Sequence, residues 1–553
     1  DICRYYPYGA LLSQVLGLTT VDSEGQSGLE SRYEDVLRGT EGSYLRQVDA
    51  RNRQLDGTEG WYIPSQQGCG LVLTIDAEIQ EMVEKAMREC IEVNQAQSVI
   101  CLVSDVKTGA ILAMCMNPCY DPNDPPRNDA ETLTELMRLT AISDVYEPGS
   151  TFKILTAASA LDSVVTTPQD SFYCSAKITV DGDTIRFFFF FFFAETMADG
   201  LKNSCNPVFV ELALRMGTDT FYRYLTAFGL GKKTGIDLPG ESPGILITSR
   251  NVKRVDLARI GFGQSVALTP IQMMMAANSV INGGKLMKPY IVSEIQTPDG
   301  ETLERFHPTV MAAPIRPETS DTMRLLLERV VSEGGGKNAA IAGYRIGGKT
   351  GTAQVYKNGR VVRDTHIGSF YGFAPVNDPQ VSILVIVKEA DVPIDYGGTT
   401  AAPFARQIMQ EMLPYLGIDP ENDEKDEEIE VPALKGLTIG DAKRKLSQVG
   451  LESVTDGANT VVLDQLPPAG AKLVKGGHVM LYTAGSEEMT PEELVCVPDL
   501  TGLGDVDCAR LVRQRGLMMS MTGQGLCTEQ SPAAGEYVQP GTTIFLLMAG
   551  DDE

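Results

Sequence analysis

Ser150 and Lys153 are three residues apart at the start of an apolar run, directly after the turn-forming pair Pro148-Gly149. Apolar side chains at helical spacing over residues 152–161 predict a largely buried helix. Because positions i and i+3 of a helix share a face, we expect the Lys153 amine beside the Ser150 hydroxyl. The free N–H groups of a helix N-terminus also favour negative charge there. This pattern predicts a serine that is activated by a lysine.

A serine hydroxyl is a weak nucleophile at neutral pH and needs a base beside it. Lysine can act as that base only where burial or a neighbouring cation lowers its pKa from about 10.4. The apolar residues around Lys153 supply the burial. The three histidines, His307, His366 and His478, lie in no motif, so a Ser-His-Asp triad is not expected.

Two further motifs follow in order, Ser204-Cys205-Asn206 and Lys349-Thr350-Gly351. Together with S-x-x-K, these motifs mark penicillin-binding proteins and class A β-lactamases. A second S-x-x-K match, at residues 104–107, follows a strand-like run. A strand would put its Ser and Lys on opposite faces, so we interpret this segment as a hairpin. We also interpret two further matches as chance: Lys107-Thr108-Gly109 to the K-T-G motif and Ser249-Arg250-Asn251 to the S-x-N motif.

Each motif has a chemical role to offer. Ser204 is placed to relay a proton between Lys153 and a leaving amine. Asn206 would orient Lys153 and hold a substrate amide. Lys349 would lower the pKa of Lys153 and attract a carboxylate. The non-catalytic alternatives are that Ser204 is a helix N-cap before Pro207 and that Lys349 is a solvated surface lysine.

The strand that carries Lys349 is also expected to bind the substrate. Glycines at 347, 348 and 351 suit a strand that a ligand backbone approaches closely. The Thr350 and Thr352 hydroxyls, with Gly351 between them, would bind a terminal carboxylate. The backbone N–H groups of Ser150 and Thr352 would form the oxyanion hole. No metal ion and no cofactor are expected.

The chain resembles the class B penicillin-binding proteins, the monofunctional D,D-transpeptidases of bacterial cell-wall synthesis. Residues 146–153 are close to the family's signature around its nucleophile. The segments that carry the rest of the resemblance are 4–9, 28–30, 73–76, 261–264, 269–272, 370–375 and 396–399. It implies acylation of Ser150 by the D-Ala-D-Ala end of a stem peptide, attack by an amine from a neighbouring strand, and covalent inhibition by β-lactams.

Two rival functions remain open at this point. One is a D,D-carboxypeptidase or β-lactamase, in which water attacks the acyl-enzyme. The other is a non-catalytic β-lactam sensor or scaffold. The resemblance further implies a glycosyltransferase and divisome or sporulation membrane proteins as partners. It also implies a location on the extracytoplasmic face of the bacterial cell membrane, with one N-terminal membrane anchor upstream of this chain.

The organisation expected is a multidomain α/β (α+β) protein. The transpeptidase domain would have an antiparallel sheet and a helical subdomain. Within it, Asp76 is expected to cap a helix, and apolar runs predict strands at 99–103, 110–115 and 381–387. The predicted parts are a partial N-terminal pedestal of the dimerisation type, a transpeptidase domain, an acidic linker and two small C-terminal α/β modules, over residues 1–72, 73–418, 419–429, 430–486 and 494–550.

An internal repeat defines the two tail modules. Val431-Pro432 matches Val497-Pro498, and the Gln465 segment matches the Gln530 segment. Each copy predicts one helix followed by short strands, and the pattern resembles PASTA modules of Gram-positive division or sporulation enzymes. Their expected role is a spacer or a packing brace, with binding of peptidoglycan or β-lactam as the alternative.

Composition limits the kinds of partner that this chain is expected to bind. At 553 residues and a formal charge of −26, the chain lacks the basic face that nucleic-acid binding needs. The sequence contains no run of about 18 apolar residues, so no membrane span is expected within it. The eleven cysteines are scattered, and we expect most of them to be small buried hydrophobic residues. Many free thiols in an external protein would indicate a reducing habitat.

Seven consecutive phenylalanines, Phe187 to Phe193, depart from the family and from ordinary protein sequence. They fit no amphipathic pattern, and an exposed run of this kind favours aggregation. We interpret them as placeholder letters for an unidentified stretch, with a real hydrophobic insert as the alternative. No role is assigned to them.

Overall fold

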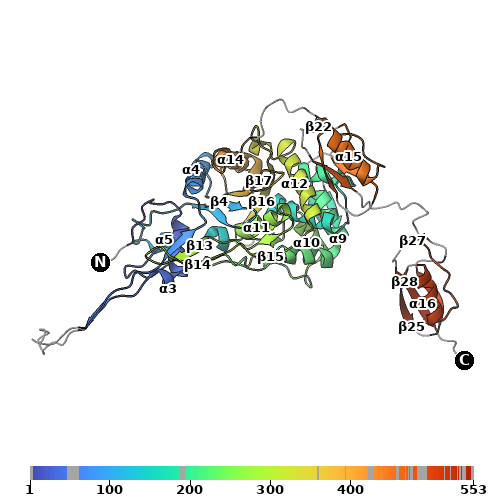
Figure 1. The fold of residues 1–553 in the computed structure, drawn as a ribbon, viewed down its shortest axis with the longest axis horizontal. Coiled ribbons are helices and arrows are strands. Elements are labelled where there is room, and N and C mark those ends of the chain that lie inside the picture. Colours follow the sequence, from blue (N-terminus) through green and yellow to red (C-terminus); the bar gives the residue numbers. More distant parts are fainter. Residues whose placement is uncertain are drawn as a thin grey trace, which may run out of the picture. The chain divides into compact units, whose positions relative to one another are not determined.

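A five-stranded antiparallel sheet forms the centre of the fold (Figure 1). The computed structural model describes residues 4–549 except 46–60, 176, 187–192, 358–359, 393, 421–428, 456–459, 467–468, 471, 474–477, 483–494, 516, 524, 532–533, 535–536 and 539–542. Most of the phenylalanine run and of the acidic linker therefore lie outside the described residues. In sheet order, the strands are β16 (Gly347–Lys357), β17 (Arg360–Ala374), β18 (Val381–Lys388), β4 (Ser98–Asp105) and β5 (Ile111–Asn117).

Helices cover both faces of this sheet, because its central strands are apolar on both sides. Side chains alternate along β4: Val99, Cys101 and Val103 face one buried cluster, whereas Ile100 and Leu102 face the other. The first cluster contains residues of α4 (Ala77–Asn94) and α14 (Ala402–Tyr415). The second contains residues of α11 (Pro270–Ile281), which is buried along its whole length. The predicted antiparallel sheet flanked by helices is confirmed.

Local sequence signals set several of these elements. The Asp76 carboxylate caps α4 by accepting hydrogen bonds from the N–H groups of Glu78 and Ile79. The expected strands at 99–103, 110–115 and 381–387 are β4, β5 and β18. The helical side of the fold comprises α7 (Lys153–Asp162), α8 (Met197–Lys202), α9 (Asn206–Ala227), α10 (Arg254–Ile260), α11 and α12 (Pro317–Ser332).

The N-terminal region joins the same body through a second sheet. β3 (Gly70–Leu73) pairs with β13 (Val292–Gln296), which pairs with β14 (Thr302–Arg305). Before it come α1 (Ser13–Leu16), α2 (Gly28–Arg32), α3 (Glu34–Leu37) and the hairpin of β1 (Ser43–Leu45) with β2 (Trp61–Ile63). The Leu12 N–H donates to Glu84 Oε1 at 2.7 Å, so this region is also hydrogen-bonded to α4.

The two tail modules have the same topology, which confirms the repeat. In the first, α15 (Ile439–Gln448) precedes a sheet of order β20-β23-β21. In the second, α16 (Asp505–Gln514) precedes β25-β28-β26. The strands are β20 (Glu452–Thr455), β21 (Asp464–Leu466), β23 (His478–Tyr482), β25 (Met518–Gly523), β26 (Leu526–Ser531) and β28 (Thr543–Ala549).

One glutamine per module makes the same pair of contacts. Gln465 Oε1 accepts from the Leu434 N–H at 2.7 Å, and its Nε2 donates to the Pro432 carbonyl at 3.0 Å. Gln530 repeats both bonds, to the Leu500 N–H and the Pro498 carbonyl, at the same distances. The side chain thus closes each module's Val-Pro entry segment onto its sheet.

Residues 1–484 and 485–553 form two compact units, and the second contains the second tail module. Within the described part of the chain, no helix has the length and apolar character to cross a bilayer. The domain boundaries given above stay predictions.

Candidate active site

Ser150 lies in a short 3-10 helix, η1 (Gly149–Phe152), that leads directly into α7. The structure thus places the serine one turn before the α-helix that the apolar pattern predicts. In a 3-10 turn the positions i and i+3 are eclipsed, so Ser150 and Lys153 still share a face. Gly149 needs its positive φ of 54° to make this turn. Ser150 is half-buried, whereas Lys153 is fully buried.

The buried Lys153 ammonium is held by the second motif. Nζ donates to the Ser204 carbonyl at 2.7 Å and to Ser204 Oγ at 3.0 Å. It also contacts the Asn206 side-chain oxygen. The Phe209 ring lies 5.2 Å from Nζ, a favourable distance for a cation–π contact. The structure therefore brings both polar residues of the Ser-Cys-Asn motif onto Lys153.

Ser204 lies in the connection between α8 and α9 with a left-handed backbone, φ 60°. The N-cap of α9 is Cys205, and no side chain caps the helix. The alternative that Ser204 is a plain N-cap is therefore wrong. Its hydroxyl instead contacts two ammonium groups, because Lys349 Nζ also lies 3.0 Å from Ser204 Oγ.

Lys349 comes from the edge strand β16 and is 1% exposed, so the surface-lysine alternative is wrong as well. Its Nζ donates to the Thr350 carbonyl at 3.2 Å. Burial lowers the pKa of Lys349 from 10.5 to about 7. Burial and the nearby Lys349 charge hold the pKa of Lys153 well below its usual range, against an opposing effect of Glu195. The effect of Lys349 on the pKa of Lys153 has the predicted direction.

Strand β16 packs closely against the turn that carries Ser150. A Cβ added at Gly351 would lie 2.4 Å from Ser369 Oγ and 3.0 Å from the Pro148 carbonyl. A Cβ added at Gly149 would lie 2.5 Å from the Thr352 carbonyl. The segment 350–352 and the Ser150 turn are therefore in backbone contact. Thr350 and Thr352 are half-buried on this strand.

Glu147 is a further residue of this site that the sequence analysis did not single out. Its Oε1 accepts from the Ser265 N–H at 2.9 Å. The same loop supplies the Gly263 carbonyl, which accepts from the Gly149 N–H at 3.1 Å. Burial raises the pKa of Glu147, although the Ser265 bond and Arg259 oppose this. The only sequence signal was its position beside the serine turn.

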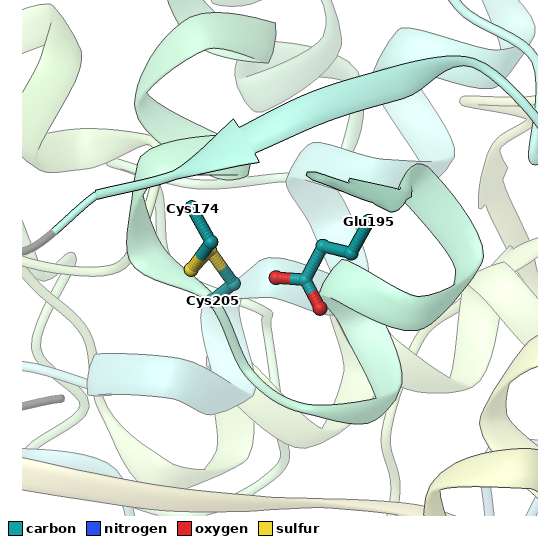
Figure 2. Close-up of side chains that lie close together, drawn as sticks. All are labelled: Cys174, Glu195 and Cys205. Atoms are coloured by element: carbon teal, nitrogen blue, oxygen red, sulfur yellow. A yellow bond between two sulfur atoms is a disulfide. The ribbon is translucent and has the colours of Figure 1, made fainter. Parts of the chain in front are cut away.

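A disulfide joins Cys174 to Cys205, the middle residue of the Ser-Cys-Asn motif (Figure 2). The carboxylate of Glu195 points toward this pair, and the three ligand-type groups lie within 4.8 Å of one another. The two sulfurs are bonded to each other, which leaves Glu195 as the only free ligand of the group. Burial raises the pKa of Glu195, whose Oε2 accepts from Asn203 Nδ2 at 2.9 Å.

The remaining described cysteines fit the expectation of small buried residues in most cases. Cys69 and Cys119 are partly exposed, whereas the others are buried: Cys90, Cys101, Cys115, Cys508 and Cys527. The two partners of the disulfide are 31 residues apart, and no sequence motif marked them as a pair.

The second S-x-x-K match is a chance match. Ser104 is the next-to-last residue of the buried strand β4, and its Oγ accepts from Asn278 Nδ2 at 3.3 Å. Lys107 lies in the turn between β4 and β5, where its Nζ pairs with Asp378 at 2.7 Å. The hairpin interpretation is confirmed.

The sequence matches three known families. Residues 99–410 match the penicillin-binding protein transpeptidase domain, and residues 1–73 match the penicillin-binding protein dimerisation domain. Residues 429–485 and 495–550 match the PASTA domain.

Characterised relatives agree with these matches. The chain is 37% identical over 499 residues to stage V sporulation protein D of Bacillus subtilis, spanning 88% of this chain and 76% of that protein. It is 30% identical over 420 residues to the peptidoglycan D,D-transpeptidase FtsI of Escherichia coli, spanning 76% and 68%.

Solved structures show the same fold. Penicillin-binding protein 3 of Mycobacterium tuberculosis, complexed with aztreonam, superposes with a TM-score of 0.68 at 27% identity, covering 76% of this chain and 92% of that one. Penicillin-binding protein 2X of Streptococcus thermophilus superposes with a TM-score of 0.67 at 21% identity, covering 98% and 82%, and supports the fold alone. The chain belongs to the class B penicillin-binding proteins, and its enzymatic domain is a peptidoglycan D,D-transpeptidase.

Proposed function

We propose that Ser150 is the nucleophile of this transpeptidase, which the substrate acylates, and that Lys153 is the general base for Ser150. The observation that carries the proposal is the buried array of Lys153, Ser204 and Lys349, in which one hydroxyl contacts both lysine Nζ atoms at 3.0 Å. The last of these residues, Lys349, is on strand β16, which contacts the Ser150 turn. A low pKa allows Lys153 to be uncharged, as a base must be.

In the first half-reaction, Ser150 Oγ attacks the carbonyl carbon of the penultimate D-Ala of a stem peptide. Its proton passes to Lys153 Nζ. Ser204 Oγ then relays a proton to the nitrogen of the terminal D-Ala as the C–N bond breaks. Free D-Ala leaves, and an ester joins the peptide to Ser150. The second half-reaction reverses these proton transfers while an amine of a neighbouring strand attacks the ester.

The other site residues bind the substrate and the charge that develops on it. The backbone N–H groups of Ser150 and Thr352 form the oxyanion hole. The hydroxyls of Thr350 and Thr352 and the Lys349 charge bind the terminal carboxylate, and Gly351 leaves room for the peptide backbone. Asn206 orients Lys153 and binds a stem-peptide amide.

Mass spectrometry after incubation with penicillin tests this assignment. One drug mass is expected on the tryptic peptide that contains Ser150, and Ser150→Ala should abolish it. Ser104→Ala, which changes the serine of the chance match, serves as the control and should label like the wild type. Labelling of the Ser150→Ala protein at another residue would refute the assignment.

The lifetime of the acyl-enzyme distinguishes a transpeptidase from a hydrolase of the same family. A penicilloyl ester that persists for many minutes supports cross-linking, whereas release of hydrolysed penicillin within seconds supports a β-lactamase. If the protein is acylated by penicillin but never transfers a stem peptide to an amine, that result would support the sensor function.

We infer that the enzyme works on the extracytoplasmic face of the bacterial membrane, held there by an N-terminal anchor outside this chain. A glycosyltransferase and membrane proteins of division or sporulation would be its partners. The similarity to a stage V sporulation protein supports the sporulation role. Deletion of the gene in a spore former should block cortex formation and leave vegetative division intact.

A further inference from the structure

A cavity of about 350 Å³ lies between the C-terminal end of α2 and the β13–β14 hairpin. This volume falls at the lower end of the range of roughly 300–1,000 Å³ that small-molecule pockets occupy. The residues that line it include none of those assigned to the transpeptidase reaction. The cavity is therefore a separate feature of the fold.

Three cationic side chains contribute to the lining. Arg32, Lys288 and Arg305 line the cavity together with His307. Lys288 is half-buried, and among the described residues its ammonium has no hydrogen-bond or ion-pair partner. The Arg32 guanidinium lies over the Tyr33 ring at 5.7 Å, and Arg305 pairs with Glu294 at 2.7 Å. Lys288 and Arg32 thus remain available to an anion.

Asp237 is the only acidic residue in the described lining, and its carboxylate is already used. Its oxygens accept from the backbone N–H groups of Ile291 at 2.8 Å and Val292 at 2.7 Å. The Tyr33 hydroxyl lies 3.4 Å away. Asp237 therefore organises the wall, and among the described residues neither Lys288 nor Arg32 forms an ion pair with a carboxylate.

Aromatic side chains supply the remaining wall. Tyr33, Tyr290 and Phe306 line the cavity beside the cations. Aromatic faces pack against apolar C–H surfaces, and Arg and Lys bind carboxylate and phosphate oxygens. A sugar ring that carries an anionic group presents both chemistries within a volume of this size.

We propose that this cavity binds a sugar bearing a carboxylate or a phosphate, as a site separate from the transpeptidase centre. Lys288 and Arg32 contact the anionic group, and the aromatic side chains pack against the ring. The stem of Lys288 passes beside Gly235, because a Cβ at that glycine would lie 3.4 Å from Lys288 Cε.

Ligand-observed NMR on the whole chain tests the proposal with three probes. N-acetylmuramic acid carries the carboxylate, N-acetylglucosamine 1-phosphate carries the phosphate, and N-acetylglucosamine is the neutral control. Saturation transfer at millimolar concentration is expected for one or both charged sugars and not for the neutral one. The charged sugar that binds identifies the anionic group. Binding should weaken as salt is added.

Lys288→Glu should raise the Kd of the bound sugar by at least about tenfold, a change of about 1.4 kcal/mol. Lys285→Glu reverses an exposed charge three residues away, outside the lining, and should leave the Kd unchanged. Penicillin labelling of Ser150 should be normal in both variants, which shows that they fold. Equal binding of the neutral sugar, unchanged binding in Lys288→Glu, or no binding of any probe would overturn the proposal.

Discussion

Lys349 Nζ lies 3.0 Å from Ser204 Oγ, inside a site where the Lys349 side chain has almost no contact with solvent. Lys153 contacts the same hydroxyl at the same distance, so the two amines share one oxygen. Two ammonium charges this close in a buried site repel each other, and the pair gives up protons more readily than isolated lysines do. This pairing keeps an amine available as a base near neutral pH.

Replacing Lys153 tests its proposed role as the base. Lys153→Ala should slow penicillin acylation of Ser150 by about 10²- to 10⁴-fold, the usual contribution of a positioned acid–base group. Stopped-flow measurement with a fluorescent penicillin gives the rate. Lys107→Ala, in the exposed chance match, is the matched control and should acylate normally. An unchanged rate in the Lys153 variant would contradict the assigned base.

Lys349 should make the protein less stable at neutral pH. Its pKa is about 7 in the folded state against 10.5 ordinarily, so the unfolded chain holds this proton to higher pH. Stability of the wild type should therefore rise between pH 7 and 10.5, by about 1.4 kcal/mol per pH unit from this group. Lys349→Met should have its largest gain in Tm at or below pH 7, shrinking as the pH rises.

Scanning calorimetry at several pH values checks this expectation. Lys337→Met, at an exposed lysine before the same strand, is the control and should shift Tm equally at every pH. The Lys349 variant should also lose penicillin acylation, since it lacks the cation that lowers the pKa of Lys153. A Tm gain that does not depend on pH would rule out the titration of Lys349 as its cause.

Glu147 should act by positioning the serine turn. Glu147→Ala leaves the half-buried Ser265 N–H without its acceptor and loosens the loop that binds the Gly149 N–H. Acylation should fall by roughly 10- to 100-fold, because small displacements of reacting groups cost up to about 10²-fold. Glu147→Gln retains the acceptor oxygen and should stay near the wild-type rate, as should Glu301→Ala at an exposed site. A loss of Tm without a loss of rate would contradict the positioning role.

The paired glutamines of the tail should contribute equally to their modules. Gln530→Ala leaves the Leu500 N–H without its acceptor and should destabilise the second module by about 1–3 kcal/mol. Gln465→Ala should do the same in the first module, and Gln448→Ala, on an exposed helix position, should not. Hydrogen exchange resolved by peptide gives the module stabilities. Acylation of Ser150 should be normal in all three, and a slowed reaction would indicate that the modules act on the active site.

The sequence predicts those parts of the structure that depend on local patterns. The cap at Asp76, the buried strand at 381–387 and the repeated tail modules follow from neighbouring residues, and all three are present. Motif order also identified the residues that the structure gathers around Lys153, because their chemistry restricts which residue types can serve.

Other features depend on contacts between distant residues, which no local pattern reveals. Glu147 meets Ser265 across 118 positions, and Cys174 meets Cys205 across 31, with no spacing rule to signal either pair. The cavity lined by Arg32 and Lys288 is another such feature, because these residues come together only where the N-terminal region packs against the rest of the fold. The 3-10 geometry at Ser150 also escaped prediction, because the apolar period is nearly the same for both helix types.

The pairing of β3 with β13 has a mechanical consequence. Residues 70–73 are hydrogen-bonded along residues 292–296, so tension on the N-terminal region would load several interstrand bonds together instead of a flexible tether. Val292, at one end of that pairing, is also the residue whose N–H is held by Asp237 in the cavity wall. Force or binding at the N-terminal region would thus reach the wall of the cavity through the β3–β13 pairing.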